Sequence, residues 1–190
     1  MRGVVMGLAC AAALAGCAAS AQTEVASTPA ALTRGQQLAD ALAAAAAAEK
    51  AGDRAALTRA VALIDRMGAR PLEGMGEDPV ALWRANSASG EQPMRGRPLG
   101  PGYRSGRIPA GGAESFAQLF LSGAGASIAL SAPNGGRVAM RVSDPQAKTV
   151  CKGEANRGST CRWVPMFTQR YTIEVANLGA EDVRYFLVVE

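Results

Sequence analysis

The sequence predicts an α+β fold in which a short N-terminal helical hairpin is followed by an antiparallel β-sandwich. Apolar residues recur at helical spacing over residues 32–68, and from Ser115 onward they alternate with polar residues. Turn residues separate the alternating segments at short intervals, as in sandwiches. The chain has 190 residues and is 48% hydrophobic, which is enough to build a core.

The first segment, residues 1–16, is predicted to be a signal peptide for export. It starts with a basic residue and continues with an apolar stretch that is too short to span a membrane. Its last residues and Cys17 spell Leu-Ala-Gly-Cys, which matches the lipobox of bacterial lipoproteins. We therefore expect Cys17 to be lipidated and to become the first residue of the mature chain. The alternative is cleavage after residues 19–21 (Ala-Ser-Ala), which leaves a soluble protein.

Residues 17–31 are small and polar and show no periodicity, which is typical of a flexible tether. Together with the lipid anchor, the tether indicates a cell-envelope protein that is held at the outer membrane and faces the periplasm. A soluble periplasmic or secreted protein is the alternative.

The cysteines fit an exported protein. Cys10 lies inside the signal peptide, and Cys17 is the expected lipidation site. Cys151 and Cys161 are then predicted to form a disulfide, because the periplasm is an oxidising compartment.

Residues 32–85 are predicted to form the helical hairpin and one further short helix. Gly52 ends the first helix and Asp53 caps the second. Pro79 starts the short helix, on which Trp83 faces the apolar side, so Trp83 is expected to dock the helices onto the sandwich. An alternative use of the hairpin is to pack its alanine face against a partner in an envelope assembly.

Residues 86–102 are rich in Gly, Pro and Arg and are predicted to be a linker. The linker and the strand after it hold the densest basic stretch of the chain. Arginine suits phosphate and carboxylate groups, so this stretch is a candidate contact for anionic lipid headgroups, acidic polysaccharide or a protein partner. A solvated linker is the simpler interpretation. The stretch comprises Arg95, Arg97, Arg104 and Arg107.

Residues 103–190 are predicted to form the β-sandwich. On the strand that follows the second disulfide cysteine, Trp163 and Cys161 share a face, so Trp163 is expected in the core beside the disulfide, with stacking on a sugar as the alternative. The expected strands lie near residues 103–108, 116–121, 127–130, 138–142, 149–151, 161–164, 170–175 and 183–189.

This C-terminal half resembles the bacterial pre-peptidase C-terminal domain, a jelly-roll β-sandwich. The resemblance is carried by a Ser-Gly-x-Ile strand (residues 105–108), an acidic residue after a glycine-rich turn, Phe116 with Phe120, and a Ser-Gly-Ala-Gly turn at residues 122–125. Asp144 stands alone, so the aspartate clusters that bind calcium in some relatives are missing. The resemblance implies an accessory, non-catalytic module and assigns no functional residue.

The composition excludes several functions. The absence of histidine excludes Ser-His-Asp and Cys-His catalysis. The net charge of +4 is spread along the chain, which argues against nucleic-acid binding. No metal or cofactor is predicted, and the acidic residues Glu73, Glu77 and Asp78 are expected in a solvated loop.

The sequence therefore predicts a non-catalytic binding or scaffolding module of the cell envelope, with an envelope protein or polysaccharide as partner. The alternatives are a hydrolase or enzyme inhibitor that uses carboxylate or Ser-Lys chemistry, and an assembly subunit that packs through the hairpin.

Overall fold

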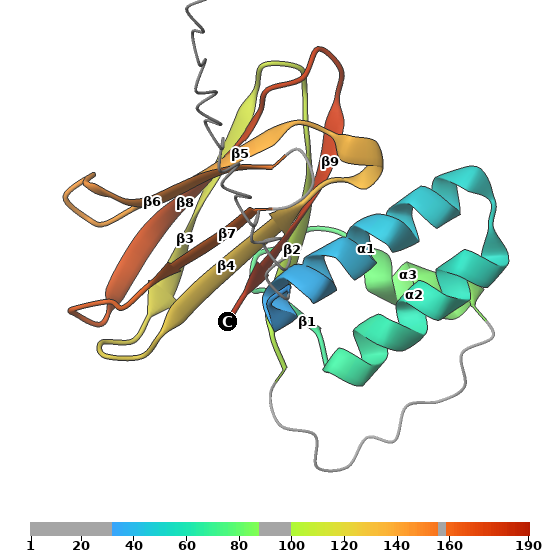
Figure 1. The fold of residues 1–190 in the computed structure, drawn as a ribbon, viewed down its shortest axis with the longest axis horizontal. Helices are drawn as coiled ribbons and strands as arrows, with labels where there is room; N and C mark the ends of the chain where they lie inside the picture. Colours follow the sequence, from blue (N-terminus) through green and yellow to red (C-terminus); the bar gives the residue numbers. More distant parts are fainter. Residues whose placement is uncertain (1–31, 88–99, 156–158) are drawn as a thin grey trace, which may run out of the picture. The chain divides into compact units, whose positions relative to one another are not determined.

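Three helices precede a two-sheet antiparallel β-sandwich, which confirms the predicted fold class (Figure 1). The computed structural model describes residues 32–87, 100–155 and 159–190. The predicted signal peptide, tether and lipidation site, and two of the candidate arginines (Arg95 and Arg97), lie outside the described residues. The helices are α1 (Arg34–Ala51), α2 (Arg54–Met67) and α3 (Pro79–Asn86).

The sandwich consists of a five-stranded sheet in the order β1-β2-β9-β4-β7 and a four-stranded sheet in the order β3-β8-β5-β6. All strand pairs are antiparallel except the pairing of β2 with the two-residue strand β1, which the sequence did not predict. The strands are β1 (Arg70–Pro71), β2 (Gly102–Ile108), β3 (Ala113–Phe120), β4 (Ala126–Ser131), β5 (Val138–Ser143), β6 (Thr149–Ala155), β7 (Ser159–Trp163), β8 (Gln169–Asn177) and β9 (Val183–Val189).

The local signals that bound the helices act as the sequence predicts. Gly52 follows α1 with a φ of 69°, a left-handed conformation that glycine adopts without steric cost. The Asp53 carboxylate accepts a hydrogen bond from the backbone N–H of Ala56 and so caps α2. Pro79 occupies the first turn of α3. Short-range sequence signals therefore place the helix ends.

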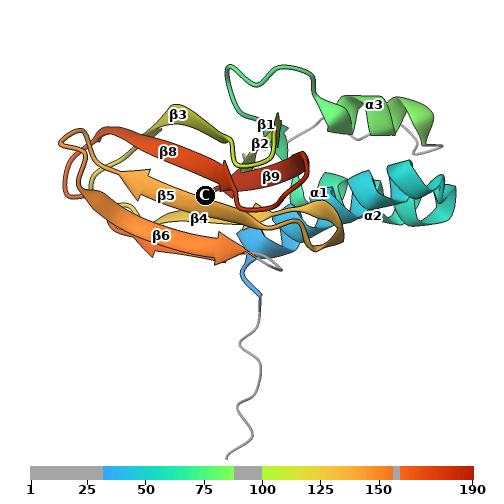
Figure 2. The ribbon, with the colours of Figure 1, turned by 90° about the horizontal axis from the view of Figure 1, so that it is seen from above.

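Helix α1 is buried on most of its surface, because β4 and β9 pack on one side of it and α2 packs on another. Both views show the helices beside the strands (Figures 1 and 2). The alanine face predicted for a partner is occupied by the protein's own sheet and second helix, which corrects the idea of an assembly subunit that packs through it. The buried apolar residues of α1 are Leu38, Ala39, Ala41, Leu42, Ala43, Ala45, Ala46 and Ala48.

Strand β9 takes part in two apolar cores. Tyr185 and Leu187 face the core between the two sheets, whereas Phe186 and Val188 face the core between the five-stranded sheet and the helices. Because both faces of β9 are buried, nearly all of its residues are apolar. Trp83 of α3 is fully buried in the second core, with its ring centroid 6.0 Å from that of Phe186, so it docks the helices onto the sandwich as predicted.

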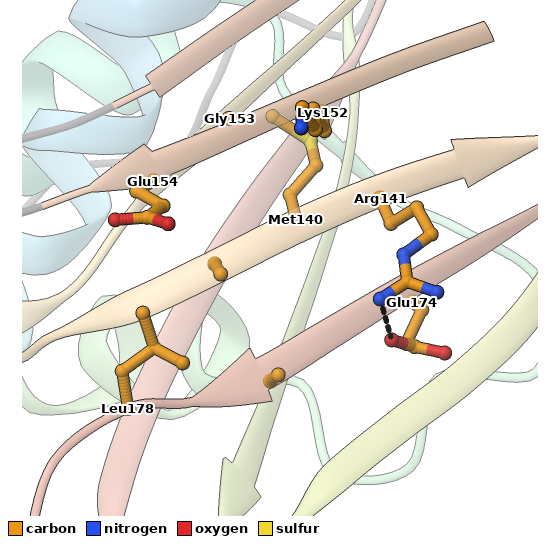
Figure 3. Close-up of a pocket in the computed structure, with 9 residues that line it drawn as sticks. Met140, Arg141, Lys152, Gly153, Glu154, Glu174 and Leu178 are labelled. Carbon is orange, nitrogen blue, oxygen red and sulfur yellow. Dashed lines mark ion pairs between the residues drawn. The ribbon is translucent and has the colours of Figure 1, made fainter. Parts of the chain in front are cut away.

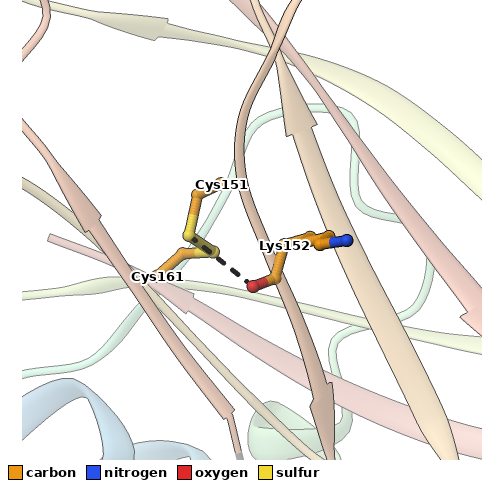
Figure 4. Close-up of a disulfide and its surroundings, with 3 residues drawn as sticks. All are labelled: Cys151, Lys152 and Cys161. Carbon is orange, nitrogen blue, oxygen red and sulfur yellow. Dashed lines mark hydrogen bonds between the residues drawn. A yellow bond between two sulfur atoms is a disulfide. The ribbon is translucent and has the colours of Figure 1, made fainter.

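The disulfide between Cys151 and Cys161 is present, as predicted (Figure 4). It joins β6, the edge of the four-stranded sheet, to β7, the edge of the five-stranded sheet, with 5.9 Å between the two Cα atoms. Trp163 also lies in the core between the sheets, against Phe120 and Tyr171, with ring centroids 4.8 and 5.6 Å away. Its expected core position is confirmed.

Replacing both cysteines of this disulfide by alanine is expected to lower the free energy of unfolding by about 2.7 kcal/mol, because the unfolded chain regains the entropy of a loop of about 10 residues. Thermal unfolding followed by circular dichroism should show a midpoint about 5–10 °C lower. The unmodified protein treated with dithiothreitol should show the same loss. An unchanged midpoint in both experiments would contradict a structural role for the bond.

Candidate functional site

The acidic loop before α3 has a structural role at Asp78. Its carboxylate caps α3 by accepting a hydrogen bond of 3.0 Å from the Val80 N–H, and it accepts a second from the Tyr103 hydroxyl. Burial and this carboxylate raise the pKa of Tyr103 above its ordinary range. Glu73 and Glu77 are exposed. The carboxylates of this loop therefore do not form a buried acid–base pair.

Arg104 forms a second polar cluster, at the margin of the core between the sheets. Its guanidinium pairs with Glu114 of β3 at 2.8 Å, donates to the Gly74 carbonyl at 3.2 Å and lies 4.5 Å from the centre of the Phe116 ring. The hydroxyl of Tyr185 is also buried in this region. Burial, followed by the negative charge of Glu114, raises the pKa of Tyr185. The Arg104 side chain is thus engaged by contacts within the protein.

The absence of a side chain at Gly106 leaves room for Glu114 and Tyr185 in this cluster. A Cβ atom at this position would lie 2.6 Å from Glu114 Oε2 and 2.6 Å from the ring of Tyr185. The glycine of the Ser-Gly-x-Ile strand and the acidic residue after it, two of the features behind the family resemblance, therefore lie against each other at the margin of the core. This explains the motif by packing and assigns it no ligand.

The open face of the four-stranded sheet carries a shallow groove of about 470 Å³ (Figure 3). Ala139 and Ala176 contribute its small side chains, and Arg141 pairs with Glu174 at 3.7 Å. Lys152 and Glu154 add one charge of each sign. The charges along this groove are balanced, so it offers no excess field to attract a charged ligand.

A larger cleft of about 790 Å³ lies where the C-terminal part of α1 meets the β4–β5 and β8–β9 loops. Clefts between structural layers are common ligand sites. Asn177 fixes its floor, since the buried Nδ2 group donates to the carbonyls of Ile108, Pro109 and Glu181 at 2.7–3.1 Å. The charged residues that line it are Glu49, Lys50, Arg107, Arg137, Glu181, Asp182 and Arg184.

The strand register places two arginines side by side in this cleft. Arg107 of β2 lies directly opposite Arg184 of β9, an arrangement of like charges that destabilises a sheet. Glu49 relieves it in part, with an oxygen 3.5 Å from the Arg184 guanidinium. Among the described residues, neither Arg107 nor Arg137 makes an ion pair, and both are exposed. An anion seated here would meet two uncommitted guanidinium groups.

The structure separates the candidate arginines. Arg104 faces the core between the sheets and Arg107 faces the helices, because alternate residues of a strand point to opposite sides. Arg107 instead shares the cleft with Arg137 and Arg184, which sequence reasoning missed as site residues. The alternation placed Arg137 and Arg184 on the polar sides of their strands. The pairing of β2 with β9 brings Arg184 opposite Arg107, and Arg137, just before β5, lines the same cleft.

Among the residues that the structure describes, no helix is long and apolar enough to cross a membrane. The same residues contain no group of three or more side chains that could hold a metal ion.

Comparison with known proteins identifies fold likeness only. No known family model matches the sequence, and no curated protein matches it. Among solved structures, the mitogen of Yersinia pseudotuberculosis is similar with a TM-score of 0.39 and 10% identity, over 46% of this chain and 81% of that one. The pre-peptidase C-terminal domain of Bacillus anthracis collagenase is similar with a TM-score of 0.38 and 14% identity, over 46% of this chain and 87% of that one.

The periplasmic inhibitor of g-type lysozyme from Aeromonas hydrophila, PliG, gives a TM-score of 0.38 and 14% identity, over 47% of this chain and 84% of that one. A pre-peptidase C-terminal domain is thus among the similar structures. Likeness at this level establishes no family and no activity for the chain.

Proposed function

We propose that this protein is a non-catalytic binding module of the bacterial cell envelope that holds an acidic polysaccharide in the cleft beside α1. The observation that carries the proposal is the position of Arg107 and Arg137, two exposed guanidinium groups without ion-pair partners in a preformed cleft. Guanidinium groups recognise carboxylate and phosphate through paired hydrogen bonds. A polymer that repeats such groups can engage both arginines at once.

The proposal also includes export and a lipid anchor at Cys17, supported by the lipobox at the end of the predicted signal peptide. Mass spectrometry of the mature N-terminus tests this part. Diacylated Cys17 as the first residue is the expected result, whereas an unmodified chain starting at Gln22 would overturn the anchor and leave a soluble periplasmic protein.

Replacing Arg107 and Arg137 together by glutamine is expected to weaken binding of polygalacturonate, an acidic polysaccharide, by at least about ten-fold, since hydrogen bonds to charged groups contribute about 1.5–3 kcal/mol. Calorimetric titration measures the affinity. Binding by the unmodified protein should also weaken as salt rises, because the screening length is only about 8 Å at physiological ionic strength.

The matched control replaces Arg59 and Arg66 of α2 by glutamine. Both are exposed and lie outside the cleft, so this variant loses the same charge and should keep its affinity. If the two double variants lose affinity equally, binding depends on net charge alone and the cleft is not the site. Absence of binding in the unmodified protein would also overturn the proposal.

A further inference from the structure

One end of the sandwich carries a cluster of exposed apolar side chains, here called the tip. It is formed by the end of β3, the loop after β3 and the loop between β7 and β8. These loops lie at the end of the sandwich opposite the β4–β5 and β8–β9 loops (Figure 1), which line the cleft. Most of the large apolar side chains exposed in the described part of the chain are gathered here. They are Leu119 (46% exposed), Leu121 (61%), Val164 (63%), Met166 (80%) and Phe167 (66%).

Hydrogen bonds between its two loops fix the conformation of the tip. Ser122 donates from its hydroxyl to the Met166 carbonyl at 2.7 Å and from its N–H to the Thr168 hydroxyl at 3.0 Å. The Gly123 N–H donates to the Pro165 carbonyl at 2.9 Å. Beneath the loops, the rings of Phe120, Trp163 and Tyr171 pack against one another. These hydrogen bonds and ring contacts fix the loop in a conformation that leaves Met166 and Phe167 exposed.

Two exposed arginines flank the tip, while the acidic Glu190 side chain near the start of β4 accepts a hydrogen bond from the Gly35 N–H. Arg162 of β7 and Arg170 of β8 are exposed and lie on the outer faces of the two sheets, so they flank the tip on opposite sides. Neither makes an ion pair among the described residues. The sequence contains no acidic residue from 115 to 143 or from 155 to 173. The nearby Asp144 carboxylate accepts the backbone N–H groups of Gln146 and Lys148 in its own turn.

We propose that the tip docks onto an anionic lipid surface, with Met166 and Phe167 entering the interface and Arg162 and Arg170 at the level of the phosphates. An apolar surface flanked by cations is complementary to such a membrane. Protein interfaces carry about one hydrogen bond per 100–200 Å², but the N–H groups of Ser122 and Gly123 are already used within the tip. A lipid surface needs no such bonds from the inserted side chains.

The start of α1 supports this orientation, in a step that rests on the proposed anchor at Cys17. The Gly35 N–H donates to the Glu190 side chain at 3.1 Å, and Glu190 pairs through its backbone with Ser127, next to the tip loop. The C-terminal part of α1 instead lines the cleft. The start of α1 therefore lies toward the tip end of the sandwich, and an anchor attached before Leu32 would be joined to the folded part at that end and not at the cleft.

The test is co-sedimentation of the exported protein carrying Cys17→Ser, so that no acyl chain contributes, with phosphatidylcholine vesicles that contain or lack phosphatidylglycerol. Binding to the anionic vesicles is expected. Met166→Ser with Phe167→Ser should weaken it at least about ten-fold. Arg162→Gln and Arg170→Gln should each weaken it on the order of five-fold. Leu82→Ser, at a 45% exposed leucine of α3, should leave it unchanged.

Failure of the unmodified protein to bind anionic vesicles, or equal binding by the Met166/Phe167 variant, would overturn the proposal. So would a photo-crosslink from position 167 to a protein partner in intact cells without vesicle binding, which would make the tip a protein-docking surface. Polygalacturonate titration of the same variants separates this proposal from the proposed function, because the tip variants should retain full affinity in the cleft.

Discussion

Replacing Trp83 by alanine is expected to lower the free energy of unfolding by about 3–5 kcal/mol, the usual cost of deleting a large buried aromatic side chain. Trp83 is 0% exposed and packs against Phe186 of β9, and the Arg184 guanidinium lies 5.6 Å from the centre of its ring. The substitution opens a cavity between the helices and the five-stranded sheet. Denaturant unfolding followed by circular dichroism measures the loss, which is a large share of the roughly 5–15 kcal/mol of a typical domain.

Trp83→Phe is the matched control. The buried Nε1–H of Trp83 has no hydrogen-bond partner among the described residues, so phenylalanine keeps an aromatic ring and removes an unsatisfied donor. Its loss should be less than half that of the alanine variant. A loss below about 1 kcal/mol for Trp83→Ala would show that the helices do not depend on this contact, since truncation of a buried tryptophan ordinarily costs several times more.

Local signals in the sequence were sufficient for most of the fold. Gly52, Asp53 and Pro79 act on backbone groups a few residues away, so their effect can be predicted without knowing the tertiary structure. The alternating segments correspond to strands for the same reason. The short strand β1 escaped because two residues, one of them a proline, carry no periodicity.

The burial of α1 was predicted only in part, for a physical reason. An alanine-rich helix has little amphipathic contrast, so its sequence does not reveal how many sides are covered. Phe186 and Val188 lie on the face of β9 opposite Leu187, and two large apolar residues on that face indicate that another layer covers the sheet. In the structure that layer is the helices.

The candidate site depended on strand register, which the sequence did not reveal. Arg107 was identified because it belongs to a dense basic stretch, but the other charged residues of the cleft come from α1, the β4–β5 loop, the β8–β9 loop and β9. Arg104, three residues earlier, turned out to belong to the interior with Glu114. Proximity along the chain was a poor guide here, because alternate residues of one strand face different layers of the protein.

Stability is expected to fall steeply above pH about 10, by up to about 2.7 kcal/mol per pH unit, because two buried tyrosines resist ionisation. Tyr103 and Tyr185 are both 0% exposed, and burial raises the pKa of each above its ordinary value. Below pH about 10 both hydroxyls keep their protons in the folded and the unfolded chain, so neither contributes a pH dependence. At higher pH the unfolded chain loses these protons and the folded chain retains them, so unfolding becomes more favourable.

Urea unfolding at a series of alkaline pH values measures this slope. The other side chains of types that lose a proton in this pH range are one tyrosine and three lysines, namely Tyr171, Lys50, Lys148 and Lys152. Tyr103→Phe with Tyr185→Phe is expected to flatten the alkaline slope even though the variant is less stable at neutral pH, where Tyr103 no longer donates to Asp78. A slope that survives both substitutions would assign the alkaline loss to other groups. A flattened slope would show that the two phenols are kept protonated by burial in the two cores that β9 joins.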